Sequence, residues 1–319
     1  IERFLTQPIK TVSAAELGKA NRAKGAQEQY SDFCAGHVAS PFAIKDLKIV
    51  VDCANGATYQ VAPLVFSKLG LNPVFIASSP DGLNINKDCG STDLGFLQQT
   101  MVQEKADIGI AFDGDGDRVC LVDHLGSLID GDDILYLLAV DLLDRGEEFG
   151  GVVGTHMTNM AFELAFRDKG IPFFRADVGD RNVIRAMKER GWLLGGEGSG
   201  HILNLKKTNT GDGLITALQI LEIINRKEKS LAEIGNTVPK YPQILKNIRC
   251  RGPESLLENH TFCAEISSCR GRLGEKGRIL VRKSGTEPLV RIMVEGQNRQ
   301  EIESIGGHLE SVAVSISQF

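Results

Sequence analysis

A repeated unit in the middle of the chain constrains the fold more than any other feature. The stretches KIVVDCANGATYQVAPLVFSKLGLNPVFIA (48–77) and GGVVGTHMTNMAFELAFRDKGIPFFRA (150–176) each contain a valine-rich strand, a polar loop with asparagine, an amphipathic helix and a second strand with a proline. Alternating strands and helices favour a mainly parallel sheet that is covered on both faces. The copies begin about a hundred residues apart, so we predict one α/β domain for each.

Both copies continue into a second polar loop between strands. In the first copy this loop lies within ADIGIAFDGDGDRVCLVD (106–123), and in the second it lies within LLGGEGSGHILNL (193–205). Proteins with α/β folds bind ligands at the carboxyl ends of their strands. We therefore expect the two loops to face one ligand.

The first of these loops places three carboxylates at alternating positions, Asp113, Asp115 and Asp117, with glycine between them. Two carboxylates about 4 Å apart repel by about 4 kcal/mol at an effective dielectric near 20, so the loop predicts a bound cation. The acidic run contains no Cys or His, and oxygen ligands favour magnesium or calcium. An EF-hand loop from Asp113 would need Gly and Glu where Arg118 and His124 stand, which excludes that calcium site.

Magnesium is the better fit, because it leaves room for a phosphate oxygen that Arg118 could also hold. The structural alternative is a solvated acidic turn between strands. In the second loop Glu197, Ser199 and His201 also alternate, so three hydrogen-bonding side chains could project toward sugar hydroxyls. A glycine-rich turn without any ligand is the alternative there.

From about Tyr241 the repeated strand–helix pattern gives way to a short strand, a polar helical stretch, a hairpin and a closing helix. This order predicts a small separate α+β domain. Its hairpin, GRILVRKSGTEPLVRIMVEG (277–296), gathers guanidinium groups, hydroxyls and backbone N–H groups at the tip, a set that suits a phosphate. The tip is not a P-loop, since GxxxxGK[ST] is absent, and a polar hairpin turn remains the alternative. The candidate phosphate ligands are Arg282, Ser284, Gly285, Thr286 and Arg291.

Composition narrows the class of protein. The 319 residues, 42% hydrophobic and 24% charged, are enough for two or three globular domains. A net charge of -5 argues against a nucleic-acid surface, and no apolar run approaches the 18 residues of a membrane span. Seven scattered cysteines without a C-x-x-C pair predict reduced thiols and a cytoplasmic location.

The segments FDGDGDRV, GGEGSGH, TGDG and RKSGTEPLVRIMVEG, in this order, resemble the α-D-phosphohexomutase family over nearly the whole chain. VDCANGATY, PDGLNIN and CGSTD are most similar to the bacterial phosphoglucosamine mutase branch of that family. The resemblance implies domains around a central cleft: two repeated α/β domains with mixed, mainly parallel sheets, and a smaller C-terminal α+β domain. The expected limits are 1–41 for the remnant of a phosphoserine domain with its linker, 42–128 for the metal-binding domain, 129–240 for the sugar domain and 241–319 for the phosphate-binding domain.

The resemblance also assigns roles. Asp113, Asp115 and Asp117 would hold Mg²⁺, and Arg118 would lie beside the transferring phosphoryl group as a catalytic residue. Glu197, Ser199 and His201 would grip the phosphosugar, with His201 also catalytic, and Gly179 and Asp180 would lie nearby. The hairpin tip would hold the phosphate remote from the reaction.

The sequence departs from the family pattern at several places. Asn182 stands where the family usually has a tyrosine, and Gly198 stands where it commonly has an amide-bearing residue. The phosphoserine loop T/S-A-S-H-N-P does not occur in this sequence, so we expect these residues alone to be inactive. The alternatives are a phosphoglucomutase or phosphomannomutase and a sugar-phosphate-binding fragment, and a homodimer is one candidate assembly.

Overall fold

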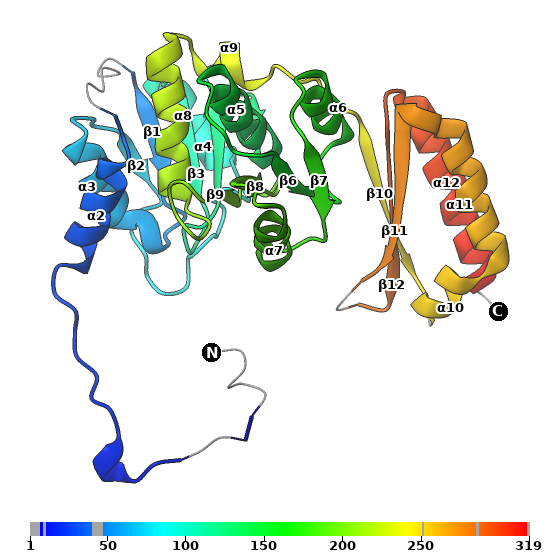
Figure 1. The fold of residues 1–319 in the computed structure, drawn as a ribbon, viewed down its shortest axis with the longest axis horizontal. Helices are drawn as coiled ribbons and strands as arrows, with labels where there is room; N and C mark the ends of the chain where they lie inside the picture. The colour runs from blue at the N-terminus through cyan, green and yellow to red at the C-terminus, as the bar shows by residue number, and fades with distance from the viewer. Residues whose placement is uncertain (1–6, 9–10, 40–46, 251, 285–286, 318–319) are drawn as a thin grey trace.

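The computed structural model describes residues 7–8, 11–39, 47–250, 252–284 and 287–317, so Gly285 and Thr286 of the predicted phosphate site lie outside the described residues. Three sheets follow one another along the chain, with helices between and after their strands (Figure 1). The first unit contains α2 (Ala26–Gly36), β1 (Ile49–Asp52), α3 (Val61–Lys68), β2 (Val74–Ile76), α4 (Gly95–Glu104), β3 (Ile108–Phe112), β4 (Val119–Asp123) and β5 (Leu128–Ile129).

The second unit repeats this plan. It contains α5 (Gly131–Asp144), β6 (Val152–Thr155), α6 (Met160–Asp168), β7 (Phe173–Ala176), α7 (Asp180–Arg190), β8 (Leu194–Gly196), β9 (Ile202–Asn204), α8 (Gly213–Lys227) and α9 (Leu231–Gly235). The strand orders are β2-β1-β3-β4-β5 and β7-β6-β8-β9. In both sheets the first three strands are parallel and the fourth is antiparallel. The internal repeat predicted from the sequence is therefore confirmed as a repeated topology.

Two helices are exchanged between the repeated units. Helix α5 follows the first sheet in sequence but packs on β8 of the second, whereas α8 follows the second sheet and packs on β3 and β4 of the first. Apolar side chains from both units form one continuous core around these helices. Helix α8 is buried on most of its surface. Asp212 caps its first turn, because its side chain accepts the backbone N–H of Ile215 at 2.9 Å.

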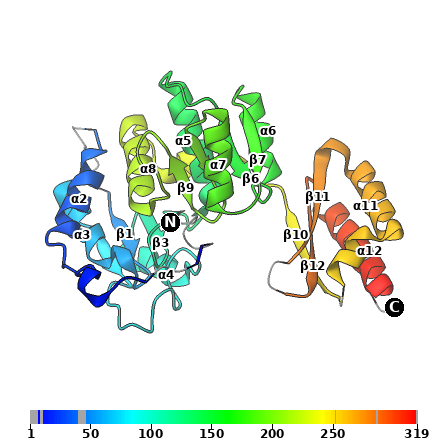
Figure 2. The same cartoon turned by 60° about the horizontal axis from the view of Figure 1, so that its bottom comes forward.

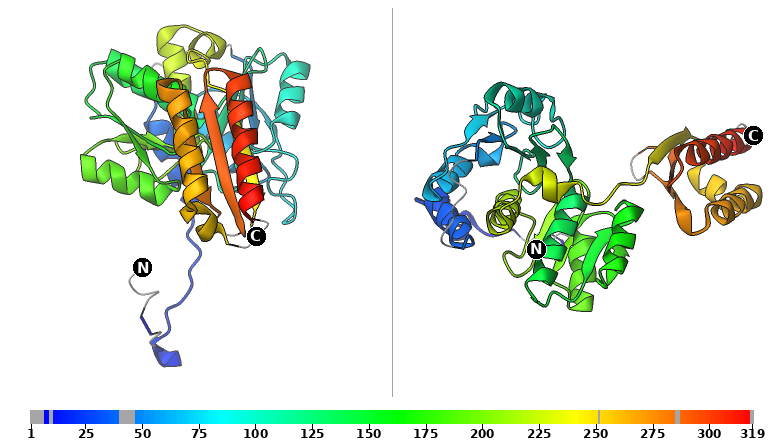
Figure 3. Two further views of the ribbon diagram at one scale, coloured as in Figure 1. Left: turned by 90° about the vertical axis from the view of Figure 1, so that its right-hand side faces the viewer. Right: turned by 90° about the horizontal axis from the view of Figure 1, so that it is seen from above.

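The C-terminal unit contains β10 (Gln243–Arg249), α10 (Pro253–Glu258), α11 (His260–Leu273), β11 (Gly277–Lys283), β12 (Leu289–Gly296) and α12 (Arg299–Ser317). Its antiparallel sheet has the order β10-β12-β11. Helices α11 and α12 cover one face of this sheet, and its core is separate from that of the repeated units (Figure 3). Figure 2 shows that this unit stands beside the second unit and is reached through the segment before β10.

The described residues bear on two further predictions. All seven cysteines are free thiols, five of them buried, while Cys250 is partly exposed and Cys263 is exposed. Among the described residues, every helix is too short or too polar to cross a lipid bilayer.

Candidate functional site

The aspartate loop, residues 113–118, joins β3 to β4 and folds around Asp113. This side chain is only 5% exposed, and its Oδ1 accepts the backbone N–H groups of Gly116 and Arg118, both at 3.1 Å. Each of the three aspartates offers a carboxylate oxygen that lies within 4.8 Å of the other two. The structure thus brings Asp113, Asp115 and Asp117 together, as their spacing predicts.

A neighbouring loop after β1 fixes the position of the aspartate loop. The backbone N–H of Ala57 donates to the carbonyl of Gly114 at 2.8 Å. A Cβ on Gly56 would lie 2.1 Å from that same carbonyl oxygen, so no larger residue fits there. Ala54 and Asn55 adopt the left-handed conformation, with φ of 53° and 47°, which turns the chain tightly enough for this approach.

The electrostatics of the aspartate loop fit a bound cation. The pKa of Asp113 is raised to about 6, mainly by burial and further by the carboxyls of Asp115 and Asp117, while the backbone N–H of Arg118 opposes the shift. Oδ1 of Asp117 is buried and has no hydrogen-bond partner among the described residues. The Nε atom of Arg118 lies 3.5 Å from Asp113 and 3.6 Å from Asp117, so one guanidinium faces two of the three carboxylates. An oxygen-only site with excess negative charge suits Mg²⁺.

The loop of residues 197–201, here named the sugar loop after its predicted role, contacts the aspartate loop directly. Nδ1 of His201 lies 3.0 Å from Oδ2 of Asp117, and the backbone N–H of Val119 donates to the carbonyl of Gly200 at 3.1 Å. The chain turns at Ser199, and Gly200 has a φ of +95°, so the loop is not extended, and the projection of Glu197, Ser199 and His201 toward one ligand stays a prediction.

The three side chains of this loop therefore have different surroundings. His201 is 5% exposed and faces the aspartate loop, whereas Ser199 is exposed. Oε1 of Glu197 accepts the backbone N–H of Gly179 at 2.9 Å, which places the turn before α7 beside the sugar loop. Asp180 is exposed, and its carboxylate accepts the backbone N–H of Arg181. The structure thus joins Gly179 to Glu197 and leaves Ser199 and Asp180 accessible.

The hairpin between β11 and β12 carries the remaining candidates. Ser284 is 9% exposed, its N–H donates to the carbonyl of Leu289 at 2.9 Å, and its Oγ accepts the N–H of Glu287 at 3.3 Å. Arg282 and Arg291 are directly opposite each other in the antiparallel ladder. Nε of Arg291 is buried and has no hydrogen-bond partner among the described residues, although its Nη2 lies 3.4 Å from Glu287. Two adjacent guanidinium groups with an unused donor fit an anion.

Arg291→Ala is expected to weaken the binding of inorganic phosphate by about ten-fold, because a charge-assisted hydrogen bond and one positive charge are lost. Isothermal titration calorimetry on the whole chain measures this. Arg299→Ala is the matched control, since Arg299 is an exposed arginine of the same unit that pairs with Glu303 on α12. Equal phosphate affinity for both variants would contradict the assignment of the hairpin.

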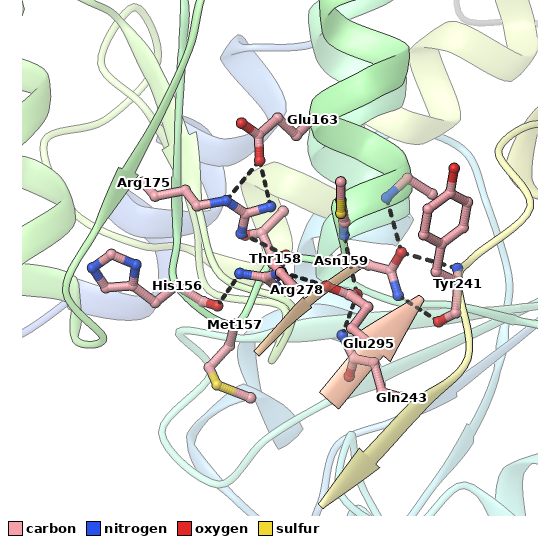
Figure 4. A network of polar contacts seen from close by, with 12 residues as sticks. His156, Met157, Thr158, Asn159, Glu163, Arg175, Tyr241, Gln243, Arg278 and Glu295 are labelled. Atoms are coloured by element: carbon pink, nitrogen blue, oxygen red, sulfur yellow. Dashed lines mark hydrogen bonds and ion pairs between the residues drawn. The ribbon is translucent and has the colours of Figure 1, made fainter. Parts of the chain in front are cut away.

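Sequence reasoning missed a polar network at the boundary of the second and C-terminal units (Figure 4). It includes Asn159, Tyr241, Arg278 and Glu295. A signal for part of it was present, because Arg278 and Glu295 are oppositely charged residues at the ends of two neighbouring strands. Their pairing could not be read without the register of the hairpin.

Comparisons with known proteins agree with this geometry. Three models of phosphoglucomutase/phosphomannomutase domains match the chain: α/β/α domain II over residues 28–126, α/β/α domain III over 130–241 and the C-terminal domain over 245–307. The chain belongs to the phosphoglucomutase/phosphomannomutase family. The aspartate loop thus falls in family domain II, the sugar loop in domain III and the hairpin in the C-terminal domain.

Individual relatives refine the placement within the phosphoglucomutase/phosphomannomutase family. The chain is 51% identical to a phosphoglucosamine mutase of Cronobacter sakazakii over 303 residues, covering 95% of this chain and 68% of that protein. It is 46% identical to the phosphoglucosamine mutase of Pseudomonas fluorescens over 317 residues, covering 99% of this chain and 71% of that protein.

Solved structures of the family share the fold. A Burkholderia thailandensis phosphoglucomutase/phosphomannomutase family protein matches with a TM-score of 0.74 at 24% identity, over 92% of this chain and 64% of that one. An N-acetylphosphoglucosamine mutase of Aspergillus fumigatus matches with a TM-score of 0.76 at 21% identity, over 91% of this chain and 65% of that one. This chain therefore spans about two thirds of the length of its relatives.

Proposed function

We propose that this chain carries the metal-, sugar- and phosphate-binding parts of a phosphoglucosamine mutase. This isomerase interconverts glucosamine 6-phosphate and glucosamine 1-phosphate through a 1,6-bisphosphate. The observation that carries the proposal is the contact between His201 and Asp117, because it joins the cation-binding loop to the sugar loop. Relatives named phosphoglucosamine mutase, at 46% to 51% identity, support it.

The positions of the side chains support a separate role for each loop. Asp113, Asp115 and Asp117 would hold Mg²⁺, which when bound neutralises charge on a transferring phosphoryl group. A related mutase of Aspergillus fumigatus was solved in complex with GlcNAc-6P and magnesium, which supports this choice of metal. Arg118 would hold a phosphoryl oxygen, and the hairpin arginines would hold the other phosphate. Positioning and electrostatics supply most of the catalysis in such a reaction.

The phosphoryl donor in this scheme is a phosphoserine, and the T/S-A-S-H-N-P string that carries it in the family does not occur in these 319 residues. We therefore propose that they bind the phosphosugar without turning it over. Calorimetry with glucosamine 6-phosphate and Mg²⁺, next to a turnover assay on the same sample, tests this. Binding without turnover is the expected result, and the absence of binding would contradict the proposed function.

A phosphoglucomutase or phosphomannomutase is the second candidate, because the aspartate loop and the hairpin do not read the sugar. Glu197→Gln is expected to lower the preference for glucosamine 6-phosphate over glucose 6-phosphate by about ten-fold, since it removes a charge near the amino group but keeps the acceptor for Gly179. Ser199→Ala should change the preference in a similar way. Competition calorimetry with the two sugar phosphates measures it.

Arg282→Ala is the comparison variant in this series, because Arg282 would contact a phosphate that both ligands share. It should weaken the binding of both sugar phosphates by the same factor and leave the ratio of the two affinities unchanged. If Glu197→Gln, Ser199→Ala and Arg282→Ala all scale the two affinities by one factor, the sugar loop does not set specificity.

We also propose a cytoplasmic location, which the seven free thiols support, since a reducing compartment keeps such thiols unpaired. The assembly state stays a prediction, with a homodimer as the candidate. Analytical ultracentrifugation of the purified chain would decide between a monomer and a dimer.

A further inference from the structure

One arginine of the C-terminal unit makes contacts on both sides of the boundary with the second unit. Arg278, on β11, donates from Nη1 to the carbonyl of His156 at 2.8 Å and from Nη2 to the carbonyl of Thr158 at 2.7 Å. Both carbonyls belong to the loop between β6 and α6 (Figure 4). Its third donor, Nε, pairs with the carboxylate of Glu295 on β12. The planar guanidinium thus uses three donors on two units.

Glu295 has a matching set of contacts and is fully buried, with 0% exposure. Its Oε1 accepts the backbone N–H of Met160 at 3.1 Å and Nε2 of Gln243 at 2.6 Å. Met160 is the first residue of α6, and a helix N-terminus favours a negative charge. A buried carboxylate is stable only with such partners, so Glu295 holds Arg278 and α6 in one arrangement.

Asn159, which precedes α6, forms a second contact beside this pair. Its partner is Tyr241, in the segment that connects the two units. Nδ2 of Asn159 donates to the carbonyl of Tyr241 at 2.9 Å, and Oδ1 of Asn159 accepts the N–H of Tyr241 at 3.1 Å. The same side chain caps α6 through the N–H of Ala161. The connection between the units is therefore fixed at one point, close to Arg278 and Glu295.

The sheet of the C-terminal unit connects this point to the phosphate hairpin. Arg278 pairs with Glu295, and Arg282 pairs with Arg291, in the same antiparallel ladder. The two pairs are four residues apart along β11, so their side chains lie on the same face of the sheet. The alternate residues, which include Ile279 and Ile292, form the core beneath α11 and α12.

The length of the strand amplifies any rotation at this point. At a rise of about 3.4 Å per residue, Ser284 lies about 20 Å from Arg278 along the hairpin. With an arm of that length, a rotation of about 10° moves the phosphate site by about 3.5 Å, more than a hydrogen bond tolerates.

We propose that the Arg278–Glu295 pair is a pivot that positions the phosphate hairpin relative to the sugar and aspartate loops. This inference rests on the proposed function, because it concerns a ligand that spans the hairpin and the sugar loop. Arg278 is a positioning residue: it acts through the hairpin and touches no ligand itself. A sugar phosphate needs both sites at a fixed separation, whereas inorganic phosphate needs only the hairpin.

The position of the C-terminal unit can be measured directly. Nitroxide labels would be placed on the exposed native Cys263 of α11 and on Val102→Cys of α4, where Val102 is 80% exposed, with Cys250→Ser removing the other accessible thiol. Pulsed electron paramagnetic resonance is expected to show one narrow distance distribution in this background. Arg278→Ala and Glu295→Gln should broaden it, and Arg278→Lys should give an intermediate width because lysine lacks the planar fork.

Ligand affinities distinguish a positioning role from a purely structural one. Arg278→Ala is expected to weaken the binding of glucosamine 6-phosphate by about ten-fold while changing the affinity for inorganic phosphate by less than two-fold. Glu295→Gln, which can still accept the N–H of Met160, should show the same split in a protein that folds normally. Arg270→Ala is the matched control, since Arg270 donates to the carbonyl of Ile279 within the C-terminal unit and should change neither affinity.

Two results would overturn the pivot. One is an unchanged distance distribution in both Arg278→Ala and Glu295→Gln, and the other is an equal loss of affinity for both ligands. Failure of the proposed function has a different signature: the unsubstituted chain would bind glucosamine 6-phosphate no more tightly than inorganic phosphate. In that case the label distances alone would still decide whether the pair fixes the C-terminal unit.

Discussion

Asp115→Asn is expected to weaken Mg²⁺ binding by about 10- to 100-fold, because one of three charged ligands becomes a neutral amide. Asp115 is exposed, so the substitution should leave the packing of the loop intact. Without metal the substituted protein should be as stable as the original or slightly more stable, since one of three mutually repelling carboxylates is gone. Calorimetric titration of Mg²⁺ and thermal unfolding in EDTA measure the two effects.

The matched control is Asp168→Asn, which removes an exposed carboxylate at the end of α6, far along the chain from the aspartate loop. It should leave Mg²⁺ affinity unchanged. If Asp115→Asn binds Mg²⁺ as tightly as Asp168→Asn does, the three aspartates are not a metal site and the loop is an ordinary acidic turn.

Gly200→Ala is expected to lower the free energy of unfolding by about 3 kcal/mol or more, from backbone strain and overpacking together. Gly200 has a φ of +95°, and a Cβ there would lie 2.2 Å from the carbonyl oxygen of Val119. Because that atom is backbone, only separation of the sugar loop from β4 can relieve the clash. The contact between His201 and Asp117 should be lost as well, so Mg²⁺ affinity should fall in the same protein.

Gly198→Ala is the control for Gly200→Ala, because it lies in the same turn and meets only ordinary contacts. A Cβ on Gly198 would lie 3.4 Å from the carboxyl group of Asp132, and the φ of Gly198 lies outside the strained range. Its effect on stability should stay below about 0.5 kcal/mol. Urea unfolding of the two variants compares them. Equal stabilities would show that the sugar loop does not pack against β4 as the structure places it.

The parts of the fold that were predictable are those with a local signal. The repeated units were visible because buried parallel strands are continuous apolar runs, as in β1 and β3, and because a helix has a 3.6-residue period. The aspartate cluster was predictable for a similar reason. Glycines between Asp113, Asp115 and Asp117 allow neighbouring residues to converge without help from distant parts of the chain.

The surroundings of the sugar loop could not be predicted locally. The chain turns at Ser199, so the spacing of Glu197, Ser199 and His201 does not by itself give the directions of their side chains. His201 consequently contacts Asp117, 84 positions away in sequence. The exchange of α5 and α8 between the two sheets was also beyond the sequence, since an apolar helix face fits either sheet equally well.

The sequence by itself determined the strands, helices, repeat and aspartate cluster, because each depends on the chemistry of residues that are close along the chain. Tertiary structure alone decided three contacts: His201 with Asp117, α8 with the first sheet, and Arg278 with Glu295 and the loop before α6. These contacts join residues separated by many positions, and their energies depend on burial and on strand register. A side chain's identity specifies what it can bind, but only the folded chain brings its partner within hydrogen-bonding distance.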